Sequence, residues 1–247
     1  MTLDERFERL NREVVGCRRC PRLVAWREQV AREKRAAFRD QDYWGRPVPG
    51  FGDPAARLLV LGLAPAAHGG NRTGRIFTGD RSGDWLFGSL WRTGFANQPT
   101  SVARGDGLAL RDCYITAPVK CAPPDNKPSP EEFERCRPYV RDELRLLQNV
   151  RVVVSLGKIA FDHYLKVCRE EGRVLPSPLP TFGHRQIYRL PWGVTLIGSQ
   201  PIVDVHGELL RSISAPSNRA SLRRPWCSCA LMVPGARPKA AATWATL

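Results

Sequence analysis

The sequence predicts an α/β fold in which a small central parallel sheet lies between two layers of helices. Four short apolar segments have the length and composition of buried strands. Helical patterns separate these segments along the chain, and apolar strands that alternate with helices form parallel sheets covered on both faces. The length of 247 residues suits one such domain. The strands are expected at 57–63, 113–119, 150–157 and 193–199.

Helices are expected before and between these strands. In the first, apolar residues recur every three to four positions from Leu3 to Val14. The clearest helix start follows the second strand, where Ser129 has the chemistry of an N-cap and Pro130 that of a first helical residue. The expected helical ranges are 3–15, 21–37, 84–95, 129–148 and 157–170.

The charge of the chain favours a polyanionic partner. Its formal net charge is +14, and a globular domain this basic typically binds nucleic acid. A host with basic proteins, or charge that only keeps the chain soluble, is the alternative explanation. The sequence contains no run of 18 apolar residues that would predict a membrane helix. Its N-terminus lacks the pattern of a signal peptide. The expected location is therefore cytoplasmic.

Two pairs of cysteines have the chemistry of metal ligands. Cys17 and Cys20 form a C-x2-C pair, and Cys121 and Cys136 form a C-x14-C pair. In an intracellular chain such cysteines are more typical of metal sites than of disulfides. A structural zinc site prefers a second close pair, whereas a four-cysteine iron–sulfur site tolerates wider spacing. The spacing alone leaves both metals open.

A glycine-rich loop follows the first predicted strand and covers residues 62–83, "GLAPAAHGGNRTGRIFTGDRSG". Ligands bind at such carboxyl ends of parallel strands. The loop is not a phosphate-binding P-loop, because Arg75 and Ile76 follow Gly74 where that motif requires lysine and a hydroxyl residue. It is not a dinucleotide fingerprint either, because no G-x-G-x-x-G run is present.

Two side chains of this loop offer chemistry of their own. Phe77 provides a flat ring, and Asp80 provides a carboxylate close to it. An aromatic face combined with backbone donors suits a flat heterocycle. The alternative is a glycine-rich turn in which Phe77 belongs to the core and Asp80 caps the next helix.

These segments together resemble the iron–sulfur branch of the uracil-DNA glycosylase superfamily, and most closely its family 5 (type B) enzymes. The resemblance rests on "PVPGFGDPAARLLVLGLAPAAHGGNRTGRIFTGDRSG", "YITAPVKCAPPDNKPSPEEFERC" and "CRRCPRLVAWRE". It covers roughly residues 13–199 and implies a three-layer glycosylase fold that forms a single domain over residues 1–199.

The resemblance implies a DNA repair enzyme that hydrolyses the N-glycosidic bond of uracil, and of other deaminated bases such as hypoxanthine, and leaves an abasic site. The damaged base is flipped out of the DNA, and Asp80 matches a carboxylate beside the attacking water. Phe77 matches a residue that stacks on the base, and Asn126 matches one that contacts it. The enzyme is expected to be monofunctional, because no lysine stands at a matching pocket position to form a Schiff base.

The resemblance also implies further site residues and a cofactor. The remaining residues expected to line the pocket are Gly62, Ala64, Pro65 and His68. A 4Fe–4S cluster is implied on Cys17, Cys20, Cys121 and Cys136. The expected partner is DNA that contains uracil or another deaminated base, bound by a monomer without any membrane contact.

The end of the chain departs from the family. A second family signature, resembling S-Y-H-x-S-x-x-N, is expected after the last strand, but Gln200 and Pro201 follow Ser199, and the next histidine is His206. The segment 200–247 is therefore atypical, and we expect it to be poorly ordered. Either a change of reading frame produced it, or His206 replaces the family histidine. The departure leaves an alternative function: a DNA-binding iron–sulfur protein of the same fold with lost or weak excision.

Overall fold

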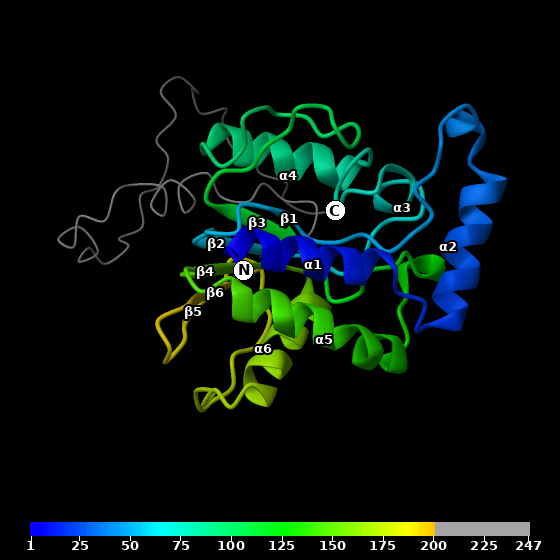
Figure 1. Cartoon of the computed structure of the whole chain (residues 1–247). Helices are drawn as coiled ribbons and strands as arrows, with labels where there is room; N and C mark the ends of the chain where they lie inside the picture. The colour runs from blue at the N-terminus through cyan, green and yellow to red at the C-terminus, as the bar shows by residue number, and fades with distance from the viewer. Residues whose placement is uncertain (201–247) are drawn as a thin grey trace, which may run out of the picture. The chain divides into compact units, whose positions relative to one another are not determined.

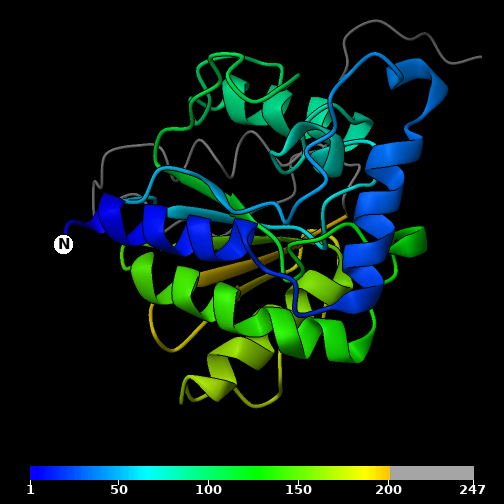
Figure 2. The same cartoon turned by 45° about the vertical axis from the view of Figure 1, so that its right-hand side comes forward.

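The computed structural model describes residues 1–200, in which a six-stranded sheet lies between helices (Figures 1 and 2). The expectations for segment 200–247, including the role of His206, lie outside the described residues except at Gln200. The strands run across the sheet in the order β1-β3-β2-β4-β6-β5. Their bounds are β1 (Phe51–Gly52), β2 (Leu58–Leu61), β3 (Cys113–Thr116), β4 (Val152–Leu156), β5 (Ile187–Arg189) and β6 (Thr195–Ser199).

The central strands β3, β2, β4 and β6 are parallel, which confirms the four strands expected from the sequence. The edge strands β1 and β5 are antiparallel to their neighbours and were not expected. Neither has the apolar run that identifies a buried strand. β1 contains two residues, and β5 exposes both Ile187 and Arg189.

The five expected helices are present, with shifted ends. α2 ends at Glu33 because Lys34 adopts a φ of 52°, and α4 begins at Arg81 because Asp80 caps it. In the described residues no helix is both long and apolar enough to cross a bilayer. The helices are α1 (Leu3–Val15), α2 (Pro21–Glu33), the single turn α3 (Gly70–Thr73), α4 (Arg81–Arg92), α5 (Pro130–Leu146) and α6 (Lys158–Glu170), with 3-10 turns η1 (Ala36–Phe38) and η2 (Pro124–Asn126).

Alternate residues of the central strands face opposite helical layers. Leu59 and Leu61 of β2 belong to the core that contains residues of α1, α5 and α6, whereas Leu58 and Val60 belong to the core that contains residues of α4. Figure 1 shows the same division, with α4 on one side of the sheet and α1, α5 and α6 on the other. This arrangement confirms the three-layer α/β/α fold.

The carboxyl ends of the parallel strands all lie at the same end of the sheet, which we call the carboxyl edge. Helix α2 stands at this end of the molecule (Figures 1 and 2). Leu23 of α2 packs with Val119 and Cys121, which follow β3, and with Ala64, which follows β2. The predicted pocket loop and the predicted cysteines are therefore neighbours at the edge where α/β proteins bind their ligands.

Candidate functional site

The glycine-rich loop begins where β2 ends. Gly62 donates its N–H to the carbonyl of Thr116 at 2.9 Å, which ties the loop to the end of β3. After α3, a left-handed Gly74 (φ 75°) reverses the chain. Phe77 then adopts a φ of 52°, which is rare for a bulky residue and is stabilised only by its surroundings. Such backbone strain is concentrated at functional sites.

The loop is packed so closely that several of its glycines leave no room for a side chain, and two of them face the predicted site residues. A Cβ atom at Gly62 would lie 2.6 Å from Cζ of Phe77, and one at Gly69 would overlap Oδ2 of Asp80. The Phe77 ring therefore lies against the backbone at the end of β2, and the Asp80 carboxylate lies against the backbone of Gly69. Glycine at these two positions leaves room for the predicted ring and for the predicted carboxylate, each beside the backbone.

Asp80 combines a structural role with a second carboxylate oxygen that faces the loop. Its Oδ1 accepts a hydrogen bond from Gly83 N–H at 2.9 Å and caps α4, so the cap weighed in the sequence analysis is present. Its Oδ2 faces Gly69. Burial raises the pKa of Asp80 above its ordinary value, although the N–H groups of Gly83 and Ser82 oppose that shift. A perturbed, desolvated carboxylate beside a loop of this kind is a functional-site candidate.

His68 is held by residues that the sequence analysis did not identify. Its Nδ1 lies 3.1 Å from the hydroxyl of Tyr43, and its carbonyl accepts a hydrogen bond of 2.7 Å from Nε of Arg72. Burial, followed by the charges of Arg35 and Arg72, lowers the pKa of His68, so the ring is neutral near pH 7. Sequence spacing gave no signal for Tyr43, because it lies 25 residues away in an irregular segment.

The other predicted pocket residues lie in two places. Pro65 is buried, and a Cβ atom at Gly70 would lie 3.0 Å from it. Ala64 is half-buried against the cluster that includes Leu23. Asn126 lies at the end of η2, with an exposed side chain and a φ of 56°. Within residues 1–200, no hydrogen bond or ion pair joins Asn126 to the glycine-rich loop, so its contact with a base stays a prediction.

The four predicted cysteines line a single small cavity. Cys17 and Cys20 lie in the connection between α1 and α2, Cys121 follows β3, and Cys136 lies on α5. The chain thus brings together two pairs that are about a hundred residues apart in sequence. In the part of the chain that the structure describes, no group of three or more His, Cys, Asp or Glu side chains is placed to hold a metal ion as it stands.

The surroundings of these sulfurs suit ligands that carry negative charge. Nη1 of the buried Arg27 lies 2.9 Å from Sγ of Cys121, and the backbone N–H of Lys120 donates to Sγ of Cys136 at 3.2 Å. Burial opposes these donors and raises the pKa of Cys121 to about 11 and that of Cys136 to about 12, so both thiols keep their protons until a metal displaces them. Hydrogen bonds to sulfur are among the interactions that tune cysteine-held iron–sulfur clusters. The donor set therefore fits a cluster.

A buried ion pair fixes the segment that carries Cys121 to α5. Nζ of Lys120 lies 2.7 and 2.8 Å from the two carboxylate oxygens of Glu143, and the hydroxyl of Thr116 donates to Glu143 at 2.8 Å. The side chains of Lys120 and Glu143 are 2% and 1% exposed. The sequence carried a signal for this pair, because Lys120 interrupts an otherwise apolar run, "APVKCAPP".

Removal of one partner of this pair should cost more stability than removal of both. Glu143→Gln leaves the Lys120 charge buried without its carboxylate, and we expect a loss of about 3–5 kcal/mol in the free energy of unfolding. The double variant Lys120→Met/Glu143→Leu leaves no buried charge and should be more stable than the single variant. Urea unfolding followed by circular dichroism measures both. A double variant less stable than Glu143→Gln would contradict this assignment.

Comparison with known proteins identifies the family of the chain. The model of the uracil DNA glycosylase superfamily matches residues 49–207. The chain is 53% identical over 190 residues to a type-5 uracil-DNA glycosylase of Mycobacterium tuberculosis, a match that covers 76% of this chain and 69% of that protein. It is 51% identical over 186 residues to a type-5 uracil-DNA glycosylase of Thermus thermophilus, over 75% of this chain and 82% of that protein.

More distant relatives carry a related name. A type-4 uracil-DNA glycosylase of Archaeoglobus fulgidus is 31% identical over 138 residues, which cover 51% of this chain and 60% of that protein. These matches confirm the resemblance stated from the sequence motifs, and they do not favour the alternative of a binding protein without excision. The chain belongs to the uracil-DNA glycosylase superfamily and, within it, to the type-5 branch.

Proposed function

We propose that this chain is a monofunctional DNA glycosylase that hydrolyses the N-glycosidic bond of uracil in DNA and leaves an abasic site. The observation that carries the proposal is the packing of Phe77 against Gly62 and of Asp80 against Gly69 at the carboxyl edge of the sheet. The type-5 uracil-DNA glycosylase names of its relatives support the same activity. Its role is the first step of base-excision repair.

The proposed chemistry needs few groups. Water attacks C1′ of the deoxyribose, the N-glycosidic bond breaks, and its electron pair leaves with the base, which then takes up a proton. The sugar becomes cationic in the transition state, so the Asp80 carboxylate stabilises it and accepts a hydrogen bond from the attacking water. This role requires Asp80 in its ionised form. The oxygen that faces Gly69 performs it, while the other oxygen caps α4.

The proposed base pocket is mostly apolar. Phe77 stacks on the flipped base, and the backbone from Gly62 through Pro65 lies beside it, with the neutral His68 further along the loop. A pocket with few polar contacts discriminates weakly between related bases. Deaminated purines such as hypoxanthine are therefore proposed as further substrates, and Asn126 is proposed to contact the base.

The structure also supports a monofunctional mechanism. Lys120 is the one lysine between residues 62 and 126, and a lysine must be a free amine to attack C1′ and form a Schiff base. Lys120 is buried and held by both oxygens of Glu143. It is therefore unsuited to act as a nucleophile, and water remains the attacking group.

Asp80→Asn is expected to slow uracil excision by about 10²–10⁴-fold, because it removes the carboxylate charge and keeps the shape of the side chain. The measurement is the single-turnover rate of alkali-labile breaks in labelled DNA with one uracil, single-stranded or opposite guanine. Asp84→Asn, at an exposed position of α4, serves as the matched control and should retain activity. Equal rates for wild type and Asp80→Asn, or no excision by the wild type, would refute the proposal.

We also propose that Cys17, Cys20, Cys121 and Cys136 hold a 4Fe–4S cluster. The proposal is supported by the shared cavity and by the Arg27 and Lys120 donors to sulfur. The cluster would join the α1–α2 connection to the end of β3 and to α5, and would thereby stabilise the fold beside the pocket. When bound, the cluster supplies a structural cross-link, and no step of the excision depends on it.

Purified without oxygen, the protein should be brown and contain about four iron and four sulfide per chain. Cys136→Ser should lower the iron content and the thermal unfolding midpoint together. Cys168→Ser is the matched control, because Cys168 is buried but does not line the cavity. Zinc in place of iron, or equal iron loss in the two variants, would contradict the cluster assignment.

A further inference from the structure

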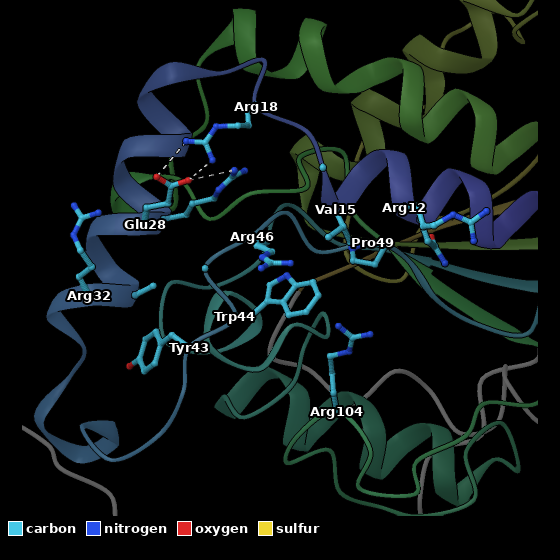
Figure 3. A pocket seen from close by; sticks show the side chains of 15 residues that line it. Arg12, Val15, Arg18, Glu28, Arg32, Tyr43, Trp44, Arg46, Pro49 and Arg104 are labelled. Carbon is cyan, nitrogen blue, oxygen red and sulfur yellow. Dashed lines mark hydrogen bonds and ion pairs between the residues drawn. The ribbon is translucent and has the colours of Figure 1, made fainter.

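A large cavity among the described residues lies outside the proposed base pocket. It has a volume of about 870 Å³ and opens between the α1–α2 region and the irregular segment that follows α2. Figure 3 shows side chains from both regions and from the loop at Arg104 arranged around it. The cavity is too large for the flipped base alone, and no residue assigned above to the base pocket lines it.

The lining of this cavity is strongly basic. Its only carboxylate is Glu28, which already pairs with Arg18 at 2.6 Å and with Arg27 at 3.9 Å. The six arginines that line it are Arg12, Arg18, Arg27, Arg32, Arg46 and Arg104. An excess of guanidinium groups in one concave surface attracts an anion, and their planar forked donors match phosphate oxygens.

Three of these arginines are available for a ligand. Arg32, Arg46 and Arg104 are exposed, and none of their side chains forms a hydrogen bond or an ion pair with another residue in the range 1–200. The guanidinium groups of Arg46 and Arg104 lie 5.7 and 4.4 Å from the ring centre of Trp44. The indole therefore supports the two cations near the middle of the cavity, as Figure 3 shows. We call this cavity the groove, and we refer to Arg32, Arg46 and Arg104 as the groove arginines.

One wall of the groove is joined directly to the loop of the proposed base pocket by hydrogen bonds. The backbone N–H of Trp44 donates to the carbonyl of Arg72 at 2.8 Å, and that of Gly45 donates to Asn71 at 3.0 Å. Tyr43, which also lines the groove, contacts His68 through its hydroxyl at 3.1 Å. The segment that forms one wall of the groove is thus hydrogen-bonded to the loop that carries Phe77 and Asp80.

We propose that this groove binds the phosphodiester backbone of the DNA strand that flanks the excised nucleotide. Phosphate is favoured over a stacked base, because the Trp44 ring is already in contact with two guanidinium groups. A strand is favoured over a single anion, because the groove arginines come from three different segments around a large cavity. The inference rests on the proposed function in one respect, namely that the ligand is DNA.

The test measures DNA binding and not excision, so its failure can be distinguished from failure of the glycosylase proposal. Binding of a uracil-free, fluorescent single strand is followed by anisotropy over a range of salt concentrations. Each lost phosphate contact reduces the slope of log K against log salt by about 0.7 for a single strand. The triple variant Arg32→Gln/Arg46→Gln/Arg104→Gln should therefore have a slope shallower by about 2.

Two further variants make the result specific. The first is a control that removes three exposed arginines outside the groove, Arg6→Gln/Arg169→Gln/Arg189→Gln. Of these, Arg189 pairs with Thr195 at the start of β6, at the end of the strands opposite the carboxyl edge. This control should keep the wild-type slope, as should a triple arginine-to-lysine variant of the groove. A groove variant with an unchanged slope, or a control with an equal loss, would overturn the proposal. Circular dichroism establishes that each variant is folded.

Discussion

The candidate site depends on the close approach of two side chains to two glycines. The Phe77 ring occupies the space that a side chain at Gly62 would need, and the Asp80 carboxylate occupies the space beside Gly69. This packing buries Asp80 and raises its pKa, and it holds Phe77 at a positive φ. Both features oppose folding locally, so the surrounding sheet and helices must compensate for them.

That compensation comes from elements that converge on the carboxyl edge of the sheet. The buried pair of Lys120 and Glu143 fixes the end of β3 to α5, and the cysteine cavity lies where these elements meet α2. On the other side of the loop, Nη2 of Arg75 contacts Asp106 at 2.6 Å and Ser101 at 2.9 Å. The loop is therefore anchored on both sides, which is the pre-organisation that electrostatic catalysis requires.

Short apolar segments predicted the four central strands, and helical sequence patterns predicted the five helices, because these elements bury their apolar residues in the core. It did not predict β1 and β5, which are short edge strands whose pairing depends on tertiary neighbours. Glycine spacing predicted a closely packed loop, in which Phe77 lies against Gly62 and Asp80 against Gly69; the roles of both side chains toward a base stay predictions. The sequence could not reveal the contact of Tyr43 with His68 or that of Arg27 with Cys121, because these partners are 25 and 94 residues apart. The basic groove was hidden for the same reason, since its arginines are spread from Arg12 to Arg104.

The pH dependence of excision tests the central claim, the burial of a catalytic Asp80, most directly. The proposed mechanism requires ionised Asp80, and burial raises its pKa, so the rate should fall as pH decreases through a value above that of an ordinary aspartate, about 3.9. The measurement is the single-turnover rate of uracil excision between neutral pH and about pH 4, with Asp80→Asn in parallel. An acid limb centred above the pKa of an ordinary aspartate, and absent from the residual activity of Asp80→Asn, would support the claim. A rate that stays constant down to pH 4, or the same limb in both proteins, would contradict it.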